Sequence, residues 1–520
     1  MGGLLRSTAV FSSLTMVSRV LGFIRDMVFA NLFGAAAATD AFFVAFKIPN
    51  FLRRLFAEGA FSQAFVPVLT EYKTLRDKAE VRLLVADVSG TLGALLLLLT
   101  LLAVAGAPML TTLFAPGWAV DKPESFALAA EMLRITFPYL LFISLTALAA
   151  GVMNTYGHFA IPAVTPVWLN LVLIGCAFWL APLFETPVMG LAWGVFFAGV
   201  VQLLFQLPTL ARMGMLARPR WAWRNEGVQR IMKLMLPGIF GSSVAQINLL
   251  LDTIIASFLV SGSVSWLYYS DRLVEFPLGV FGIALATVIL PSLSQRHAEA
   301  DPHRFSRTLD WALRWVLLIG APAMLGLILL AGPIITTLYQ HGAFSLEDVE
   351  MSRLSLMAYA VGLPGFILVK VLAPGFYARQ DTRTPVRFGV YAMVSNMLLN
   401  IAFVVPMAMA GIKGPHAGLA LATGLAAFIN AGMLFHRLRK DGVYHAEQGW
   451  AAFALRIIIA NGVMVAFLWW GGDGLQQWID WQVMERVWRL AGLIVGAVVI
   501  YLVALLLLGI RPRQMLGRMD

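Results

Sequence analysis

The sequence has little charge and almost no cysteine. Only 13% of its 520 residues are charged, 60% are hydrophobic, and the mean hydropathy is +0.80. A soluble domain carries about one-quarter charged residues, because its exterior must face water. The single cysteine, Cys176, has no partner for an intrachain disulfide and cannot build a cysteine metal cluster. These shortages argue against a soluble enzyme and indicate a chain whose surface mostly faces lipid.

Several catalytic patterns are also missing. No GxxxxGK[ST] phosphate loop occurs, so the chain is not expected to hydrolyse ATP. No loop carries the cluster of Asp, Glu and His residues that a membrane glycosyltransferase or polymerase usually needs. His297 and His303 lie near acidic residues, but in a basic loop where solvation explains them better.

What the sequence does contain is a nearly unbroken series of apolar windows. A helix needs about 20 apolar residues to cross roughly 30 Å of hydrocarbon. The windows lie at residues 9–32, 38–58, 83–107, 128–152, 159–182, 188–210, 232–257, 265–290, 311–331, 354–376, 385–408, 415–436, 450–471 and 488–510. The sequence therefore predicts an all-α polytopic membrane protein with about fourteen transmembrane helices.

The basic residues of the loops predict the orientation of these spans. Lysine and arginine concentrate in the even-numbered loops and in both tails, for example in segments 73–82 and 212–233. The odd-numbered loops carry few, such as Lys122, Lys413 and Arg486, and hold many acidic residues. Basic loops stay on the cytoplasmic side. Both termini are therefore predicted to be cytoplasmic, and the net charge of +10 reflects these loops and not nucleic acid binding.

Weak internal matches recur at similar offsets along the chain. Gly190-Leu-Ala at the start of span 6 matches Gly418-Leu-Ala at the start of span 12. The end of span 2, with Pro67, matches the end of span 8, with Pro291. Such a parallel repeat predicts two six-helix lobes, at residues 1–215 and 216–440, related by an axis along the membrane normal. Residues 441–520 then form an additional pair of C-terminal spans.

Ionisable residues concentrate in three of the apolar windows, each of which holds three or more. Each such residue costs roughly 2.5–3.5 kcal/mol at mid-membrane on insertion scales, so its presence needs a reason. In spans 1, 2 and 8 they are Arg19, Arg25, Asp26, Asp40, Lys47, Arg53, Arg54, Glu58, Asp271, Arg272 and Glu275. So many charges are expected to face a water-filled cavity or one another, and not lipid.

Helical spacing groups some of these charges on common faces. Arg19 and Asp26 are seven residues apart, and residues at that spacing share a face of a helix. The same rule aligns a second stripe on span 2, made of Asp40, Lys47, Arg54 and Glu58. Pro49 is expected to kink this span and so to re-aim Arg53, which lies off the stripe.

Two interpretations of these charges stay open. In one, they are salt bridges that lock helices together. In the other, the guanidinium groups form a receptor for a diphosphate, because arginine stays protonated and its planar fork of donors suits phosphate oxygens. The predicted substrate-binding residues are Arg19, Arg25, Arg53 and Arg272. The acidic residues predicted to line or gate the same cavity are Asp26, Asp40, Glu58 and Glu275.

Four segments make the chain similar to a known family. They are TMVSRVLGFIRD at 15–26, TDAFFVAFKIPNFLRRLFAEGAFSQAFVP at 39–67, SVSWLYYSDRLVEFP at 263–277 and KVLAPGFYARQDTRTP at 370–385. Together they resemble the MurJ (MviN) family of lipid II flippases, within the multidrug/oligosaccharidyl-lipid/polysaccharide exporter superfamily. The likeness covers essentially the whole chain.

The resemblance implies a task as well as a fold. Lipid II, the undecaprenyl-diphosphate-linked peptidoglycan precursor, would move from the cytoplasmic to the periplasmic leaflet of the bacterial inner membrane by alternating access. It implies that the four arginines match the family's cavity arginines, and that Asp40 and Glu58 match acidic residues considered important. Spans 13 and 14 would form a groove for the polyprenyl tail. Partners would be lipid II, membrane lipids and the cell wall synthesis machinery.

A bound monovalent cation is a further expectation from the resemblance. Asp252 in span 7, with Asn396 and Asn400 in span 11, would supply oxygen ligands like those of a sodium site in some members. A hydrogen-bonded polar cluster is an equally good interpretation of these three residues. No other cofactor is expected.

Competing functions make different demands on the sequence. An exporter of cationic drugs would need an acidic pocket, whereas this chain offers arginines. A flippase for another lipid-linked glycan would make the same physical demands, and only the family motifs distinguish it from a lipid II flippase. A polytopic glycosyltransferase would need catalytic acids on a large loop. A passive division scaffold would tolerate neutralisation of the cavity arginines.

Overall fold

The computed structural model describes residues 2–55, 61–472 and 474–510, and within these ranges the chain is helical and contains no strand. The chain divides into two compact units, Met1–Ser265 and Trp266–Asp520. The all-helical class predicted from the apolar windows is therefore confirmed. In lipid a helix satisfies all its backbone hydrogen bonds internally, which is why long apolar runs adopt this structure.

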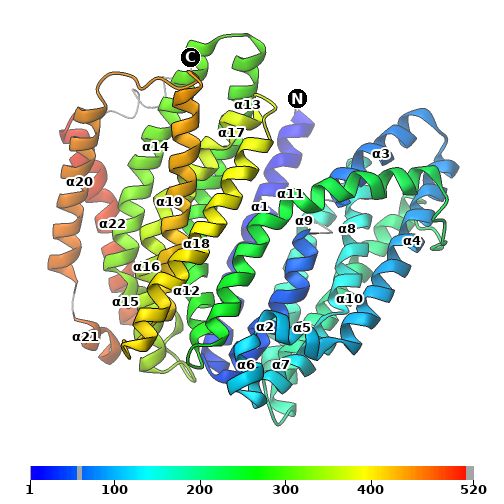
Figure 1. The fold of residues 1–520 in the computed structure, drawn as a ribbon, viewed down its shortest axis with the longest axis horizontal. Helices are drawn as coiled ribbons and strands as arrows, with labels where there is room; N and C mark the ends of the chain where they lie inside the picture. The colour runs from blue at the N-terminus through cyan, green and yellow to red at the C-terminus, as the bar shows by residue number, and fades with distance from the viewer. Residues whose placement is uncertain (1, 56–60, 473, 511–520) are drawn as a thin grey trace. The chain divides into compact units, whose positions relative to one another are not determined.

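The first unit holds helices α1 to α11 and the start of α12 (Figure 1). Their bounds are α1 Gly2–Phe33, α2 Ala37–Arg53, α3 Ser62–Leu75, α4 Lys78–Ala105, α5 Ala107–Phe114, α6 Pro116–Asp121, α7 Pro123–Thr136, α8 Tyr139–Thr155, α9 Ala160–Gly175, α10 Met189–Arg212 and α11 Glu226–Ser257. Helix α9 continues through a π turn, Cys176–Leu180, and a short 3₁₀ turn, Ala181–Leu183. Helix α1 packs along α9, α2 packs on α7, and α10 packs on α8 and α9.

The second unit holds most of α12 and helices α13 to α22. Their bounds are α12 Ser263–Pro277, α13 Ile283–Ala298, α14 Pro302–Leu329, α15 Ala331–Tyr339, α16 Leu346–Leu372, α17 Pro374–Tyr377, α18 Arg383–Met409, α19 His416–Lys440, α20 Trp450–Gly471, α21 Leu475–Asp480 and α22 Val483–Leu507. A π turn, Leu278–Gly282, joins α12 to α13. Helices α20 and α22 lie side by side, and they pack on α14 and α15 (Figure 1).

Each of the fourteen predicted spans overlaps a helix among the described residues. Within the part of the chain that the structure describes, eleven stretches are long and apolar enough to cross a membrane by length and composition. They lie on α4, α7–α8, α9, α10, α12–α13, α14, α16–α17, α18, α19, α20 and α22. The three other predicted spans fall on α1, α2 and α11. Helix α2 is only 17 residues long and carries Asp40, Lys47 and Arg53.

Side-chain caps fix where several helices begin. Asp77 accepts a hydrogen bond from the backbone N–H of Glu80 at the start of α4, and Asn225 accepts from Gly227 and Val228 at the start of α11. Ser345 forms a reciprocal capping box with Asp348 at the start of α16. Each cap satisfies N–H groups that the first turn of a helix leaves without a partner.

The core of the second unit depends on a close crossing of α16 and α19. A Cβ atom placed on Gly362 would lie 2.4 Å from the Cα atom of Gly424 on the facing helix. Small residues allow helix backbones in membranes to approach this closely, and van der Waals packing then replaces the hydrophobic effect as the source of association.

The division into units follows packing and not the sequence repeat. Helix α11 contacts α3, α4 and α6, which places it with the first unit. The boundary between Ser265 and Trp266 therefore lies beyond the lobe boundary at 215/216 that the repeat predicts. The division into two six-helix lobes with a C-terminal pair stays a prediction.

Candidate functional site

Arg25 and Asp26 form a buried charged pair in the C-terminal third of α1. Arg25 is 5% exposed and Asp26 is 1% exposed. The Nε and Nη2 atoms of Arg25 donate to Asp26 Oδ1 at 3.0 and 2.7 Å, and its Nη1 donates to Asn170 Oδ1 on α9 at 3.0 Å. The amide of Asn170 in turn donates to the backbone oxygen of Ser18 on α1 at 3.0 Å. The guanidinium thus joins α1 to α9.

The other arginines of the first unit are more accessible. The side chain of Arg19 on α1 is exposed, and that of Arg54, at the end of α2, is also exposed. Arg53 is partly exposed, and its Nε donates to Asn50 Oδ1 at 3.2 Å. Glu58, predicted to share a stripe with Arg54, lies outside the described residues. Of the three arginines predicted to bind substrate in this unit, Arg25 is therefore buried, whereas Arg19 and Arg53 keep exposed surface.

Asp40 binds the turn that leads into α12. Its carboxylate accepts from the backbone N–H of Gly262 at 2.6 Å and of Ser265 at 2.8 Å, and from the Ser265 hydroxyl at 2.5 Å. The same face of α2 carries Lys47, whose Nζ donates to Thr253 Oγ1 at 2.6 Å. As the seven-residue spacing predicted, the side chains of Asp40 and Lys47 lie on the same face of α2, and both contact residues between 253 and 265. A buried carboxylate with three donors is a structural contact, and it leaves Asp40 little capacity for substrate.

Arg272 lies on α12 within a small aromatic and acidic cluster. Its Nη1 donates to Glu275 Oε2 at 2.8 Å and its Nη2 donates to the Tyr268 hydroxyl at 3.3 Å. The guanidinium carbon lies 5.1 Å from the centre of the Tyr268 ring. The side chain is still 32% exposed. Arg272 thus keeps accessible surface while Tyr268 and Glu275 set its direction; neighbouring Asp271 is partly buried.

The residues predicted for a cation are all buried. Asp252 lies on α11 in the first unit, whereas Asn396 and Asn400 lie one turn apart on α18 in the second unit. Carboxylate and amide oxygens are suitable donors for a hard monovalent cation. No group of three or more His, Cys, Asp or Glu residues that could hold a metal ion occurs among the described residues.

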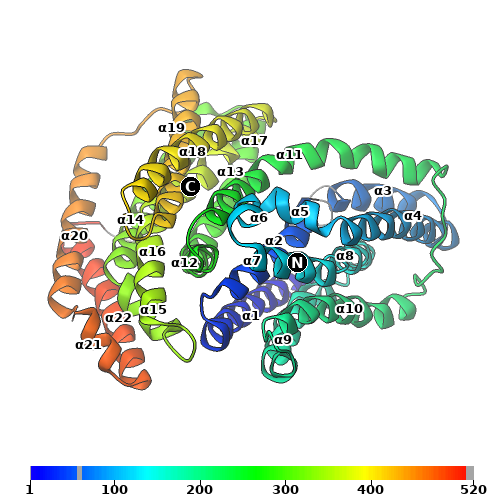
Figure 2. The same ribbon diagram turned by 60° about the horizontal axis from the view of Figure 1, so that its bottom comes forward.

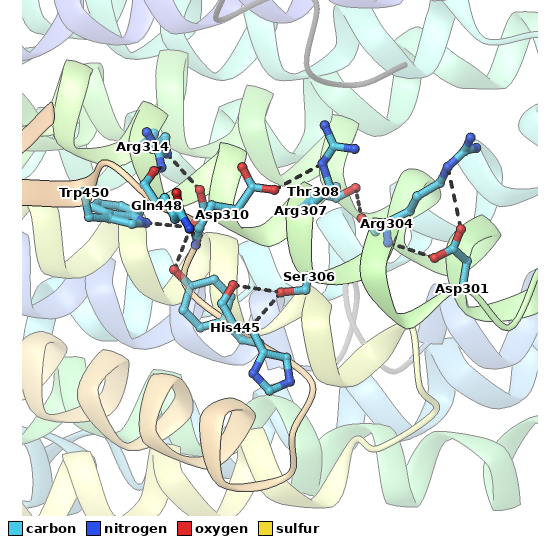
Figure 3. Close-up of polar contacts among 12 residues, drawn as sticks. Asp301, Arg304, Ser306, Arg307, Thr308, Asp310, Arg314, His445, Gln448 and Trp450 are labelled. Atoms are coloured by element: carbon cyan, nitrogen blue, oxygen red, sulfur yellow. Dashed lines mark hydrogen bonds and ion pairs between the residues drawn. The ribbon is translucent and has the colours of Figure 1, made fainter.

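A second buried charged cluster surrounds Asp310 near the start of α14 (Figure 3). Asp310 Oδ2 accepts from Arg314 Nε at 2.8 Å. Its Oδ1 accepts from the Tyr444 hydroxyl at 2.9 Å, the backbone N–H of Glu447 at 3.2 Å and Trp450 Nε1 at 2.6 Å. The cluster fixes residues 441–449, the connection between α19 and α20, against α14.

An apolar pocket of about 500 Å³ lies beside this cluster. Helices α14, α16 and α19 contribute Leu313, Leu368 and Phe428. Tyr444 comes from the connection to α20, and Trp450 is the first residue of α20. Two of the side chains that bind Asp310 therefore also line the pocket. Its lining suits a hydrocarbon chain and offers little to a charged ligand.

The partners of these charges were not predicted from the sequence. Asn170, 145 residues away from Arg25, has no distinguishing pattern in the sequence. The Asp310–Arg314 pair and Asp87 on α4 were detectable, because each places a charge within or at the edge of an apolar window. Burial at 1% for Asp310 and 0% for Asp87 shows that both are internal.

Comparison with known sequences identifies relatives over the whole chain. A family profile described as lipid II flippase MurJ matches residues 29–492. A protein of Vibrio cholerae named probable lipid II flippase MurJ is 51% identical, covering 98% of this chain and 97% of its own length. A protein of Burkholderia cenocepacia named lipid II flippase MurJ is 42% identical over 98% of each chain.

Solved structures with the same fold are also known. An inward closed conformation of a lipid II flippase MurJ is 28% identical and superposes with a TM-score of 0.79, covering 95% of this chain and 98% of that one. An inward-facing multidrug transporter of the MATE family is 15% identical with a TM-score of 0.67, covering 84% of this chain and 98% of that one. The second likeness concerns the fold alone.

Proposed function

This chain belongs to the lipid II flippase MurJ family and is a lipid transporter, and we propose that its intramembrane arginines receive the diphosphate of lipid II as the lipid changes leaflet. The direction is from the cytoplasmic to the periplasmic leaflet. Peptidoglycan synthesis on the outer side of the membrane consumes the transported precursor. No covalent bond is made or broken, so the chain needs no catalytic residue.

The physical problem is the transfer of a polar headgroup through hydrocarbon. A diphosphate moved unaided into a medium of low dielectric loses hydration worth tens of kcal/mol by Born-type estimates. Guanidinium groups replace part of that hydration, because each donates several charge-assisted hydrogen bonds in a planar fork. The polyprenyl tail meanwhile stays in the bilayer. In our proposal the arginines are exposed alternately to the two sides of the membrane.

The observation that carries the proposal is the accessibility of arginines on predicted spans. Arg19 is exposed and Arg53 and Arg272 are partly exposed, although such residues are costly in lipid. We assign these three the first contacts with the diphosphate. Arg25 is the least available of the four, because Asp26 and Asn170 occupy its donors. It joins the phosphate contacts only when an oxygen of the substrate displaces one of these partners.

The lipid tail needs a separate apolar path. Helices α20 and α22 pack on α14 and α15, and the pocket of about 500 Å³ lies between α14, α16, α19 and the beginning of α20. We propose that this face of the second unit, including the pocket, accommodates part of the polyprenyl chain.

Three finer points are part of the same proposal. In this proposal both termini are cytoplasmic, because the even-numbered loops are basic, and the chain lies in the bacterial inner membrane. A monovalent cation bound by oxygen atoms of Asp252, Asn396 or Asn400 would couple its gradient to transport. Association with the enzymes of cell wall synthesis would deliver the lipid to its point of use.

The experiment that tests the arginine assignment is replacement of Arg53 by Ala, Gln and Lys in a strain depleted of its own flippase. We expect Arg53→Ala and Arg53→Gln to abolish growth and to leave lipid II in the inner leaflet in a leaflet-accessibility assay. Arg53→Lys should retain part of the activity, since it keeps the charge but loses the planar fork. Arg304→Ala is the matched control, because this exposed arginine pairs with Asp301 outside the predicted spans.

Wild-type growth with Arg53→Gln at normal membrane abundance would refute the assignment. Solvent access can be tested in the same strains, because Cys176 is the only cysteine and Cys176→Ser gives a cysteine-free background. Cysteines at Arg19 or Arg53 should react with a water-soluble thiol reagent. Leu98→Cys, at an exposed apolar position on α4, should face lipid and stay inert.

A further inference from the structure

The connection between α10 and α11, residues 213–225, exposes its largest side chains. Trp221 and Trp223 are 58% and 45% exposed, and their rings stack with centres 6.3 Å apart and planes 14° from parallel. Leu216 in the same segment is 43% exposed. A tryptophan ring stabilises a protein chiefly when its large apolar surface is removed from water. Two stacked tryptophans that faced only water would lack this contribution. Their exposure therefore points to a surface that covers them.

The backbone of this connection is held rigidly on α4. Asp87, which is 0% exposed, accepts from Arg220 Nε at 2.8 Å and from Asn225 Nδ2 at 2.8 Å. The N–H of Arg220 donates to the backbone oxygen of Ala86 at 2.9 Å, and that of Ala222 donates to Thr91 Oγ1 at 3.0 Å. The exposed tryptophans are thus mounted on a fixed support.

Gly90 makes this close approach possible. A Cβ atom at this position would lie 2.2 Å from the backbone nitrogen of Arg220, so only glycine fits against the connection. Figure 2 shows the connection from α10 to α11 passing the end of α4. Close packing and hydrogen bonds to α4 therefore fix the position of the segment that carries the two tryptophans.

Basic side chains surround the two tryptophans. Arg212, Arg218, Arg220 and Arg224 are all exposed. A second basic segment, distant in sequence, lies beside them: Arg82 Nη2 donates to the backbone oxygen of Leu216 at 3.1 Å. That segment also carries the exposed Lys73, Arg76 and Lys78. We call the surface formed by residues 73–82 and 212–224 the basic-aromatic face.

The acidic residues near this face do not neutralise it. Glu80 pairs with Arg76, Glu71 pairs with Arg230, and Asp87 pairs with Arg220. Asp77 caps α4, leaving Glu226 as the remaining nearby carboxylate. Exposed cations without a paired carboxylate among the described residues are Lys73, Lys78, Arg82, Arg212, Arg218 and Arg224. The face therefore carries a net positive charge.

We propose that the basic-aromatic face docks on anionic phospholipid headgroups of the cytoplasmic leaflet. The loop charges place this face on the cytoplasmic side. Tryptophan prefers the headgroup level of a bilayer, where its ring is buried and its N–H stays hydrated. Arginines beside it then bind lipid phosphates, and juxtamembrane cations are attracted by the negative surface of this leaflet. The occupant is a lipid surface and not the transported substrate.

The docking has a mechanical consequence for the first unit. Asn225 both binds Asp87 and caps α11, so the face, α4 and the start of α11 form one connected structure. Binding of this face to an anionic leaflet therefore holds the N-terminus of α11 at a fixed depth in the membrane. This role does not depend on the identity of the transported lipid.

The test uses full-length protein in nanodiscs, in the Cys176→Ser background. A fluorescent NBD probe on Ala222→Cys, or in a second preparation on Leu216→Cys, is quenched by lipids that carry a nitroxide on the headgroup. We expect stronger quenching by spin-labelled phosphatidylglycerol than by spin-labelled phosphatidylcholine. The preference should fall roughly fivefold for each arginine removed in Arg218→Gln and Arg224→Gln, and it should weaken with added salt.

Arg304→Gln with Arg307→Gln is the matched control, since these two exposed arginines lie at the start of α14 and pair with Asp301 and Glu447. This double variant should keep the full preference at the probe. Equal quenching by the two lipids would overturn the proposal. A probe that no headgroup nitroxide quenches at either position would also overturn it, and would favour a soluble partner for the tryptophans. Arg218 and Arg224 carry no assigned role in transport, so failure here leaves the flippase proposal intact.

Discussion

Replacement of Asp310 by alanine should destabilise the second unit strongly. The carboxylate is 1% exposed and accepts from Arg314, Tyr444, Trp450 and the backbone of Glu447. Asp310→Ala leaves the Arg314 guanidinium, itself 5% exposed, without its carboxylate. Breaking a buried ion pair by removing one partner costs roughly 3–5 kcal/mol, because the remaining charge stays buried without compensation. We expect a loss of that size in the free energy of unfolding.

The loss can be measured by equilibrium unfolding in mixed micelles with a rising mole fraction of sodium dodecyl sulfate. Limited proteolysis gives a local readout, since residues 441–449 should become accessible once Asp310 no longer binds them. The double variant Asp310→Leu with Arg314→Met should lose much less stability, because it removes both charges together. Asp301→Ala, which breaks an exposed pair with Arg304, should cost about 1 kcal/mol or less.

The reasoning would be refuted if Asp310→Ala were no more destabilising than Asp301→Ala. It would also fail if the double variant were as unstable as the single one, because the orphaned charge would then not be the cause. Tyr444 and Trp450 line the apolar pocket beside the cluster, so Asp310→Ala should in addition reduce transport of the long-tailed lipid more than that of a short-chain analogue.

Two other predictions concern packing and ion dependence. Gly362→Val should destabilise the second unit by about 1–3 kcal/mol in the same unfolding assay, because an added Cβ would lie 2.4 Å from the Cα atom of Gly424. The control Gly432→Val should change the free energy of unfolding little, because nothing lies within 4 Å of an added Cβ there. Equal effects would contradict the close crossing of α16 and α19. If a cation binds as proposed, transport in proteoliposomes should fall when sodium is replaced by choline, and Asn396→Leu should remove this dependence. A wild-type rate that is the same in sodium and in choline would rule out a sodium requirement.

The sequence alone determined the class of structure and the family. Apolar windows of spanning length have one stable solution in lipid, the helix, since backbone groups there find no water. The predicted windows accordingly coincide with helices, from α1 to α22. The motif at 15–26 and its companions identified the family, and the comparisons over the whole chain confirmed it. Spacing also placed Asp40 and Lys47 on a common face, because helical geometry is local.

Only the tertiary structure decided which charges are held and which are accessible. Arg19 and Arg25 look alike in sequence, yet one is exposed and the other binds Asp26 and Asn170. The exposure of Trp221 and Trp223 is also decided by tertiary structure. It depends on the close packing of Arg220 against Gly90, 130 residues earlier in the chain. Hydropathy and spacing describe neighbours along one helix. The partner of a buried charge is chosen by the packing of helices that are distant in sequence, and no local pattern encodes that choice.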